Sequence, residues 1–182
     1  MPRPEERPTM AQALRSAIRM ESGDYLADAY KFLWMGGPLY RWSTKEPELI
    51  FKEGWTRQDG YDDIVKHTSV AQGKGSNWLS CSLSRTATQD YGTYCYEILL
   101  THPHTKAIDA NAMVKAMTKH LNPHFAQQEI SVYKKIAASE VRGCWVPIPE
   151  AKRDITRDLA LTSGHLFFEE EYEYVVNPGY VK

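Results

Sequence analysis

Short stretches rich in aromatic and β-branched residues follow one another from residue 39 onward, separated by polar, glycine-containing or proline-containing segments. Residues of these types favour the pleated, half-buried surface of a β-sheet. Few of the stretches alternate with helices as βαβ units do, so mostly antiparallel pairing is expected. In the last stretch Phe168, Tyr172 and Tyr174 alternate, which predicts one buried face. The expected strands are Leu39–Trp42, Trp78–Ser84, Tyr94–Leu100, Gln128–Tyr133, Val141–Ile148 and Leu166–Val176.

Helical patterns are concentrated ahead of these strands. Thr9 and Asp24 are placed to cap two helices, and Gly23 is placed to end the first of them. The expected helices and helical turns are the helix from Thr9 to Gly23, Tyr25–Met35, Pro47–Phe51, Asp62–His67, Ser84–Tyr91 and Asn111–Leu121. The predicted fold class is therefore α+β: N-terminal helices followed by two packed, mostly antiparallel small sheets with a cleft between them.

The length of the chain fits one domain. Its 182 residues can bury a sizeable core, and no change of composition marks a second domain. We expect residues 1–8, which are charged and proline-rich, to form a flexible arm and residues 9–182 to form a single domain. A formal net charge of −1 indicates no broad nucleic-acid footprint. We also expect no membrane span and no secretory signal, because the chain has neither a long apolar run nor an apolar segment at its start.

Three cysteines, Cys81, Cys95 and Cys144, lie in apolar or strand-like surroundings. This odd number favours reduced, buried thiols in a protein of a reducing compartment, and one disulfide with a spare thiol is the alternative. The histidines and cysteines show no spacing typical of a zinc site, and no glycine-rich dinucleotide motif follows a strand. Neither a metal nor a Rossmann-type site is therefore expected.

Polar side chains on or beside three of the expected strands suggest a site for chemistry. Arg41 carries a rigid fork of donors that matches phosphate oxygens, and Ser80 belongs to a hydroxyl-rich strand. Gln127 and Glu129 are two residues apart, so on a strand both side chains would project from one face. Each feature alone is commonplace on a solvated strand. Together, these residue types suit binding a diphosphate and stabilising positive charge on a sugar.

In this order, the three stretches resemble the Arg–Ser–Glu motifs of the cholera- and pertussis-toxin-like mono-ADP-ribosyltransferases. The resemblance extends over residues 39–145: Ser43 and Pro47 follow Arg41 at matching places, and Ile-Ser-Val follows Glu129. Gln127 gives a Gln-x-Glu element where arginine-modifying relatives have Glu-x-Glu. The other departures are Trp42, Lys45–Glu46 and Cys81, the last in the middle of a motif that is usually Ser-Thr-Ser.

The resemblance implies that NAD is the substrate, bent in the cleft, and that no metal takes part. It implies that Arg41 clamps the diphosphate or the adenosine ribose and that Glu129 stabilises an oxocarbenium-like transition state. Ser80 would contact NAD and hold Glu129 in its orientation. Gln127 would meet the acceptor, so that Glu129, Gln127 and Ser80 form the catalytic set.

Two further residues occupy positions where this family contacts NAD. His67 lies in the polar segment before the hydroxyl-rich strand, and Tyr91 lies where an aromatic ring stacks on nicotinamide or ribose. For His67 the alternative is a solvated loop histidine. For Tyr91 the alternative is a core position, and Tyr94 competes for the stacking role.

The acceptor is the least determined part of the implied function. Because Gln127 is neutral and is not a base, we expect transfer to a non-arginine side chain of a target protein in a host. The alternatives are a guanine base of a nucleic acid, water (an NAD glycohydrolase) and a non-catalytic NAD-binding module. The resemblance further implies a monomeric bacterial toxin or effector, secreted or injected, that acts in the cytoplasm of the target cell.

Overall fold

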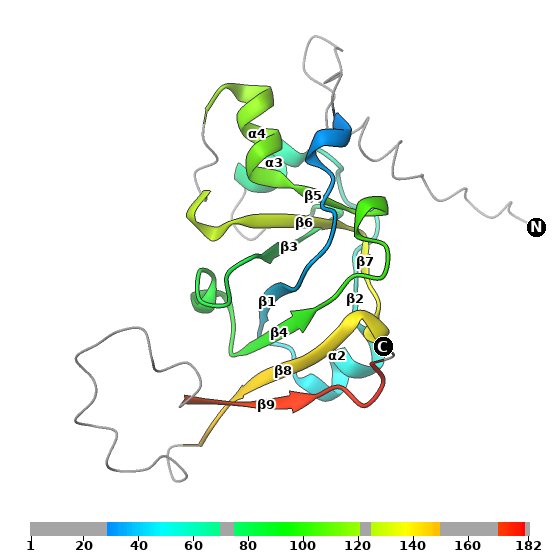
Figure 1. The fold of residues 1–182 in the computed structure, drawn as a ribbon, viewed down its shortest axis with the longest axis vertical. Coiled ribbons are helices and arrows are strands. Elements are labelled where there is room, and N and C mark those ends of the chain that lie inside the picture. The colour runs from blue at the N-terminus through cyan, green and yellow to red at the C-terminus, as the bar shows by residue number, and fades with distance from the viewer. Residues whose placement is uncertain (1–28, 70–74, 121–124, 150–170, 181–182) are drawn as a thin grey trace, which may run out of the picture.

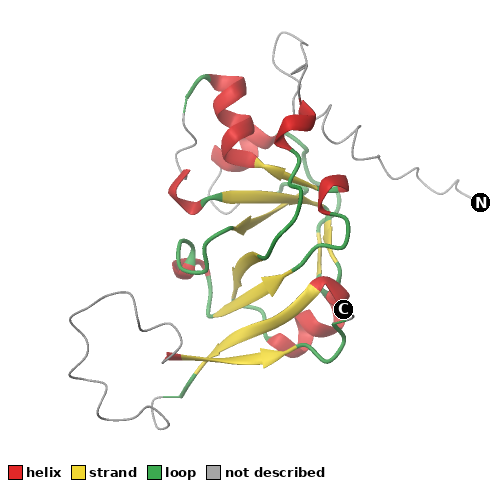
Figure 2. Ribbon diagram, viewed as in Figure 1, coloured by secondary structure: helices red, strands yellow, loops and turns green. Residues whose placement is uncertain are grey.

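A computed structural model describes residues 29–69, 75–120, 125–149 and 171–180. Its main feature is a seven-stranded antiparallel sheet in the order β5-β6-β3-β1-β4-β8-β9, accompanied by the pair β2-β7 (Figures 1 and 2). The strands are β1 (Leu39–Ser43), β2 (Trp55–Thr56), β3 (Trp78–Ser82), β4 (Tyr94–Ile98), β5 (Ala107–Asp109), β6 (Glu129–Tyr133), β7 (Lys135–Ile136), β8 (Val141–Pro147) and β9 (Tyr172–Val176). The predicted α+β class is confirmed.

The large sheet consists of two halves that meet at β1 and β3 (Figure 1). Only Tyr40 and Ser82 are paired there, whereas β1 pairs with β4 along its whole length from Leu39 to Ser43. One half contains β5, β6 and β3, and the other contains β1, β4, β8 and β9. The two small sheets expected from the sequence are therefore joined edge to edge through one residue pair.

Two apolar clusters support these halves. In the first, Ile50 of α2 (Pro47–Glu53) packs with strand residues that include Leu39 and Ile130. In the second, α3 (Ile64–Ser69) and α4 (Ala110–Thr118) cover the half that contains β6, and Ile64 and Met113 meet Trp78. Burying such side chains contributes about 2 kcal/mol each, so both clusters stabilise the strands that carry the polar residues.

The sequence sets the ends of these helices locally. The Asp109 carboxylate accepts the backbone N–H of Ala112 at 2.9 Å and so caps the start of α4. Gly54 ends α2 at φ 66°, and a Cβ there would come within 2.2 Å of the Ile136 carbonyl oxygen. Only glycine fits this close approach between α2 and β7. The helical turn predicted at Pro47–Phe51, with its end at Gly54, is confirmed.

The prediction of a helix over Tyr25–Met35 is wrong for the part of this segment that the structure describes, from Ala29 onward. Only a 3-10 turn forms there, at Ala29–Phe32. Leu33 then bridges to Ile108, and the backbone N–H of Trp34 donates to the Ala107 carbonyl at 2.9 Å. The segment covers the otherwise open edge strand β5, which competes with helix formation. The predicted arm 1–8 and the predicted helix from Thr9 to Gly23 lie outside the described residues.

The other predicted helices differ mainly in extent. The turn expected at Asp62–His67 is α3, and the helix expected at Asn111–Leu121 is α4. Of the helix expected over Ser84–Tyr91, only a 3-10 turn at Gln89–Tyr91 forms. Among the described residues, no helix combines the length and apolar character that a membrane crossing requires.

The predicted buried face of the last strand is wrong where it is described. Tyr174 is 39% exposed, because β9 is the edge strand of the sheet among the described residues and pairs there with β8 alone. Phe168 lies outside the described residues. The two- and three-residue strands β2, β5 and β7 were not predicted, since stretches this short show no periodicity. All three cysteines are free and buried, as predicted.

Candidate active site

The candidate site is built on the paired strands β3 and β6. Glu129 opens β6 and is only 6% exposed. In the register of the pair, Ser82 lies opposite Glu129 and Ser80 lies opposite Ser131. Residues directly opposite one another share a face of the sheet, so this acidic side chain and three hydroxyl groups lie on one face.

A histidine completes this polar cluster. His67, in the last turn of α3, places Nε2 3.0 Å from the Glu129 Oε1 and 3.0 Å from the Ser80 Oγ. The Ser131 hydroxyl donates to the same Oε1 at 2.8 Å. Because a carboxylate only accepts hydrogen bonds, Nε2 carries the proton in this contact. The Nδ1 of His67 is buried without a partner among the described residues.

These contacts determine the charge of Glu129. Burial raises the pKa of its carboxyl, but His67, Ser131 and Ser80 act against burial, and the net shift of the pKa is downward from 4.5. Hydrogen bonds that favour the charged form of an acid have this effect. The site therefore holds a buried, ionised carboxylate with a fixed orientation, which can stabilise positive charge on a ligand.

Arg41 approaches the cluster from β1. Tyr40 pairs with Ser82 and shares its face, so by alternation Arg41 leaves the strand on the other face. Its guanidinium lies over the Trp55 ring, 5.6 Å from the centroid, and donates to the main-chain oxygen of Ser80. Burial lowers the pKa of Arg41, and the charge of Glu129 acts in the opposite direction. Arg41 and Glu129 thus lie next to different parts of Ser80: Arg41 contacts its main-chain oxygen, and Glu129 lies near its hydroxyl group. No hydrogen bond joins Arg41 to Glu129 among the described residues.

The Nε of Arg41 matters for ligand binding. This atom is buried and has no hydrogen-bond partner within the described part of the chain. A buried donor without a partner is costly in a folded protein. An anionic oxygen at this position would satisfy it, so the guanidinium is suited to hold a phosphate group.

Gln127 does not share a strand with Glu129, so the predicted common face is wrong. Gln127 ends a 3-10 turn, and Gln128 has a left-handed φ of 49° before β6 begins at Glu129. The Gln127 side chain instead donates to the hydroxyl of Tyr91 at 2.8 Å. The Ser82 hydroxyl donates to the Gln127 carbonyl at 2.6 Å, which fixes this turn to β3.

Tyr91 and Tyr94, the two candidates for stacking on the ligand, differ in their exposure to solvent. Tyr91 is 46% exposed and contacts Gln127, whereas Tyr94 packs against the first apolar cluster. Cys81 belongs to the same cluster and faces away from the hydroxyl groups of Ser80 and Ser82. Burial raises the pKa of the Cys81 thiol to about 12, so this thiol is not a nucleophile.

The structure therefore brings together Arg41, His67, Ser80 and Glu129, and it pairs Gln127 with Tyr91 beside them. Sequence reasoning assigned no role to Ser131 or to Ser82. The signal for Ser131 was present in its spacing, two residues after Glu129 on the same strand. Within the described ranges, no group of three or more His, Cys, Asp or Glu residues is arranged to hold a metal ion.

Comparisons with known proteins place this geometry in context. A family model described as "Pertussis toxin, subunit 1" matches residues 37–142, which is more than half of the chain. Scabin toxin from Streptomyces scabies, in complex with NADH, is 21% identical with a TM-score of 0.56, covering 81% of this chain and 77% of scabin. A guanine-specific ADP-ribosyltransferase is 22% identical with a TM-score of 0.55, covering 81% of this chain and 79% of that one. No curated protein matches. At these identities the solved structures show a shared fold.

Proposed function

Because the chain belongs to the pertussis toxin subunit 1 family of NAD-dependent ADP-ribosyltransferases, we propose that Glu129 is its catalytic carboxylate. In this proposal the enzyme breaks the bond between the ribose C1′ and the nicotinamide nitrogen of NAD and transfers ADP-ribose to an acceptor. The observation that carries the proposal is the buried Glu129 carboxylate, held by His67 and Ser131 beside the Ser80 hydroxyl.

The reaction needs a negative charge more than it needs a base. When the C1′–N bond breaks, nicotinamide leaves with the bonding electron pair and positive charge develops on the ribose. Glu129 stabilises this charge and hydrogen-bonds to the 2′-hydroxyl, as carboxylates do beside sugars in glycosidases. The acceptor atom then shares its lone pair with C1′ and releases a proton.

Arg41, Ser80 and His67 are assigned supporting roles. Arg41 binds the diphosphate through its guanidinium, which converts binding energy into positioning of the ribose. The partnerless Nε of Arg41 supports this assignment, because a phosphate oxygen would satisfy it. Ser80 and His67 orient Glu129 and line the NAD site. We assign Tyr91, which is exposed, to the entrance of the NAD site.

The acceptor side is assigned to Gln127, which is paired with Tyr91 at the surface. A neutral amide does not pair with a guanidinium as a glutamate does, so arginine is disfavoured. An amide donates and accepts together and so matches the edge of a base. A structure of similar fold is named a guanine-specific ADP-ribosyltransferase, which favours a guanine base as the acceptor. The second candidate is a non-arginine side chain of a target protein, favoured by the pertussis toxin family match.

We further propose that residues 9–182 form one catalytic domain that acts as a monomer inside target cells. Scabin, which has a similar fold, is named a toxin and comes from Streptomyces scabies. A bacterial toxin or effector that is secreted or injected fits this family.

The test of the proposed function uses NAD labelled in its adenosine part. The protein is incubated with this NAD and with single-stranded DNA, with a cell lysate, or with buffer alone. Label on DNA supports the guanine acceptor, label on a protein supports the second candidate, and free ADP-ribose alone indicates a glycohydrolase. An absence of NAD cleavage in all three would contradict the proposal.

The pH dependence of NAD cleavage provides a second test. Because the pKa of Glu129 is lowered from 4.5, the carboxylate stays charged at neutral pH. Activity should therefore be constant on the acid side until the pH falls below about 4.5 and should be lost as the pH passes through the lowered pKa. Initial rates in short assays check this. The Ser131→Ala variant loses a hydrogen bond that stabilises the charged form of Glu129. Its activity should therefore be lost at a higher pH than that of the wild type. If both proteins lost activity at the same pH, the hydrogen bond from Ser131 would not set the charge of Glu129.

A change at Gln127 separates transfer from hydrolysis. In Gln127→Glu, a negative charge replaces the neutral amide next to Tyr91, while the contacts of Glu129 are unaltered. We expect transfer to the native acceptor to fall about tenfold more than hydrolysis, since a charge at an acceptor contact costs about 1.4 kcal/mol or more. The measurement is the ratio of transferred to free ADP-ribose. Equal losses of both products would exclude an acceptor-side role.

A further inference from the structure

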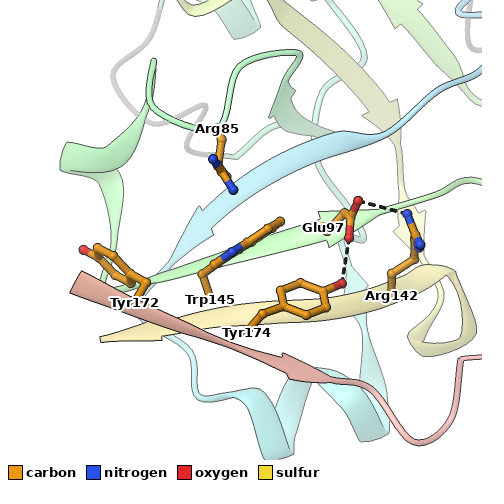
Figure 3. Close-up of a pocket in the computed structure, with 6 residues that line it drawn as sticks. All are labelled: Arg85, Glu97, Arg142, Trp145, Tyr172 and Tyr174. Carbon is orange, nitrogen blue, oxygen red and sulfur yellow. Dashed lines mark hydrogen bonds and ion pairs between the residues drawn. The ribbon is translucent and has the colours of Figure 1, made fainter. Parts of the chain in front are cut away.

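A hollow of about 430 Å³ lies on the half of the sheet that does not contain Glu129. It is lined by Arg85, Glu97, Arg142, Trp145, Tyr172 and Tyr174 (Figure 3). These residues come from β4, β8, β9 and the segment after β3, and none of them belongs to the cluster around Glu129. The assigned chemistry of NAD cleavage leaves the hollow without a role.

The hollow and Glu129 face the same side of the sheet. The register places Glu129, Ser82, Tyr40 and Glu97 opposite one another in one row across four strands. Residues in such a row point to one face. At about 4.8 Å per strand, the three steps from Glu129 to Glu97 span about 14 Å. A ligand longer than one nucleotide can therefore contact both places at once.

The lining of the hollow is largely aromatic. The rings of Trp145 and Tyr174 have centroids 4.6 Å apart, and Tyr40 lies 5.9 Å from Trp145. The guanidinium of Arg85 lies over the Trp145 ring, 5.0 Å from its centroid. Figure 3 shows Arg85 approaching from the side of the hollow opposite Trp145. Aromatic rings and guanidinium planes are the surfaces on which unpaired nucleobases stack.

The charge of the hollow suits a phosphate. Glu97 is its acidic residue, and its carboxylate accepts from Arg142 at 3.0 Å and from the Tyr174 hydroxyl at 2.6 Å. Counted over the described lining residues alone, Arg85, Arg142 and Glu97 carry formal charges that sum to +1. The net charge of the whole chain is −1, so positive charge here is local.

We propose that this hollow docks a nucleotide that flanks the reactive guanine of a single-stranded nucleic acid. The flanking base stacks on the Arg85–Trp145 pair, and its phosphate lies near the arginines. The strand continues along the row of residues to the acceptor site beside Gln127. The proposal rests on the proposed function with a guanine acceptor, and it adds that a strand binds more tightly than a free nucleotide.

Binding is measured by calorimetry without NAD, so no transfer occurs. The probes are a short single-stranded DNA with one central guanine, and guanosine 5′-monophosphate. The variants are Arg85→Gln, Trp145→Ala and Trp145→Phe, which keeps a ring. Lys52→Gln is the matched control, because it removes one positive charge from an exposed position on α2.

We expect DNA to bind more tightly than the mononucleotide. Arg85→Gln and Trp145→Ala should weaken DNA binding about tenfold, as removal of a base-stacking side chain does, and Trp145→Phe should retain most of it. Lys52→Gln should bind as the wild type does. In a transfer assay, the ratio of ADP-ribosylated DNA to free ADP-ribose should fall in Arg85→Gln.

Several results would overturn the proposal. One is DNA binding that is equal in Arg85→Gln and the wild type, and another is a mononucleotide that binds as tightly as the strand. Displacement of the DNA by ADP-ribose would assign the hollow to NAD instead. A wild-type protein that cleaves NAD but labels only protein would also exclude a nucleic-acid dock and leave the proposed enzyme intact. No NAD cleavage at all would instead contradict the proposed function.

Discussion

Replacing Glu129 with glutamine is expected to lower NAD cleavage by about 10³-fold, the loss that follows removal of one preorganised charged contact to a transition state. Glutamine keeps the shape of the side chain and a carbonyl oxygen that can accept from Ser131. It removes the negative charge that faces the ribose in the proposed mechanism. The cleavage rate is measured from released nicotinamide under saturating NAD, together with the thermal midpoint of the protein.

A second buried carboxylate provides the matched control for this experiment. Glu140 is 4% exposed, against 6% for Glu129, and it lies outside the polar cluster of the site. Glu140→Gln should lower the thermal midpoint, because it weakens an ion pair with Lys106, and should leave the cleavage rate of the folded protein unchanged. If both variants lost the same activity, the loss would reflect folding. If Glu129→Gln remained near full activity, Glu129 would not be the catalytic carboxylate.

The parts of the site that could be predicted depend on strand alternation and pairing. The sequence placed Ser80 and Glu129 on strands with hydroxyl groups nearby, and β3 and β6 do pair through these residues. Cys81 was expected to be a buried thiol, and alternation along β3 places it in the apolar core, on the face opposite Ser80 and Ser82. These local rules apply over five-residue strands whether or not the rest of the fold is known.

The parts that could not be predicted depend on turns and on distant contacts. Gln127 was assumed to share the face of Glu129, but the left-handed φ of Gln128 breaks the strand between them. Such a conformation is rare for residues other than glycine, and no local pattern indicates it. The contact from His67 on α3 also arises only when the helix packs on the sheet. The sequence placed His67 at the end of a helical turn, as an NAD contact or a solvated histidine, and gave no sign of its contact with Glu129.

The narrow contact between the two halves of the sheet leads to a second prediction, which concerns the stability of the protein. Since β1 and β3 share one register pair, other contacts must hold the half with Glu129 against the half with Arg41. Lys106, just before β5, reaches Glu140, just before β8, with Nζ 2.5 and 2.7 Å from its two carboxylate oxygens. Glu140 also accepts the backbone N–H groups of Thr101 and Ala137. This ion pair therefore ties the two halves together.

Lys106→Met is expected to lower the free energy of unfolding by about 3 kcal/mol, because it leaves a buried carboxylate without its cation. The value is at the low end for buried pairs, since the Lys106 side chain is 22% exposed. For a chain of this size, the thermal midpoint should fall by roughly 6–12 °C. Urea titration and a thermal scan measure both quantities, with the exposed Lys52→Met as the control.

The double variant Lys106→Met/Glu140→Gln determines whether the loss comes from the pair itself. Once Glu140 is neutral, the missing cation no longer leaves a buried charge, so the double variant should be more stable than Lys106→Met alone. Thr101 and Ala137 donate to different oxygens of Glu140, so in the double variant only one of these backbone N–H groups can still donate to the glutamine oxygen. Simple addition of the two single losses would mean that Lys106 and Glu140 act independently. In that case, apolar packing alone would hold the two halves together.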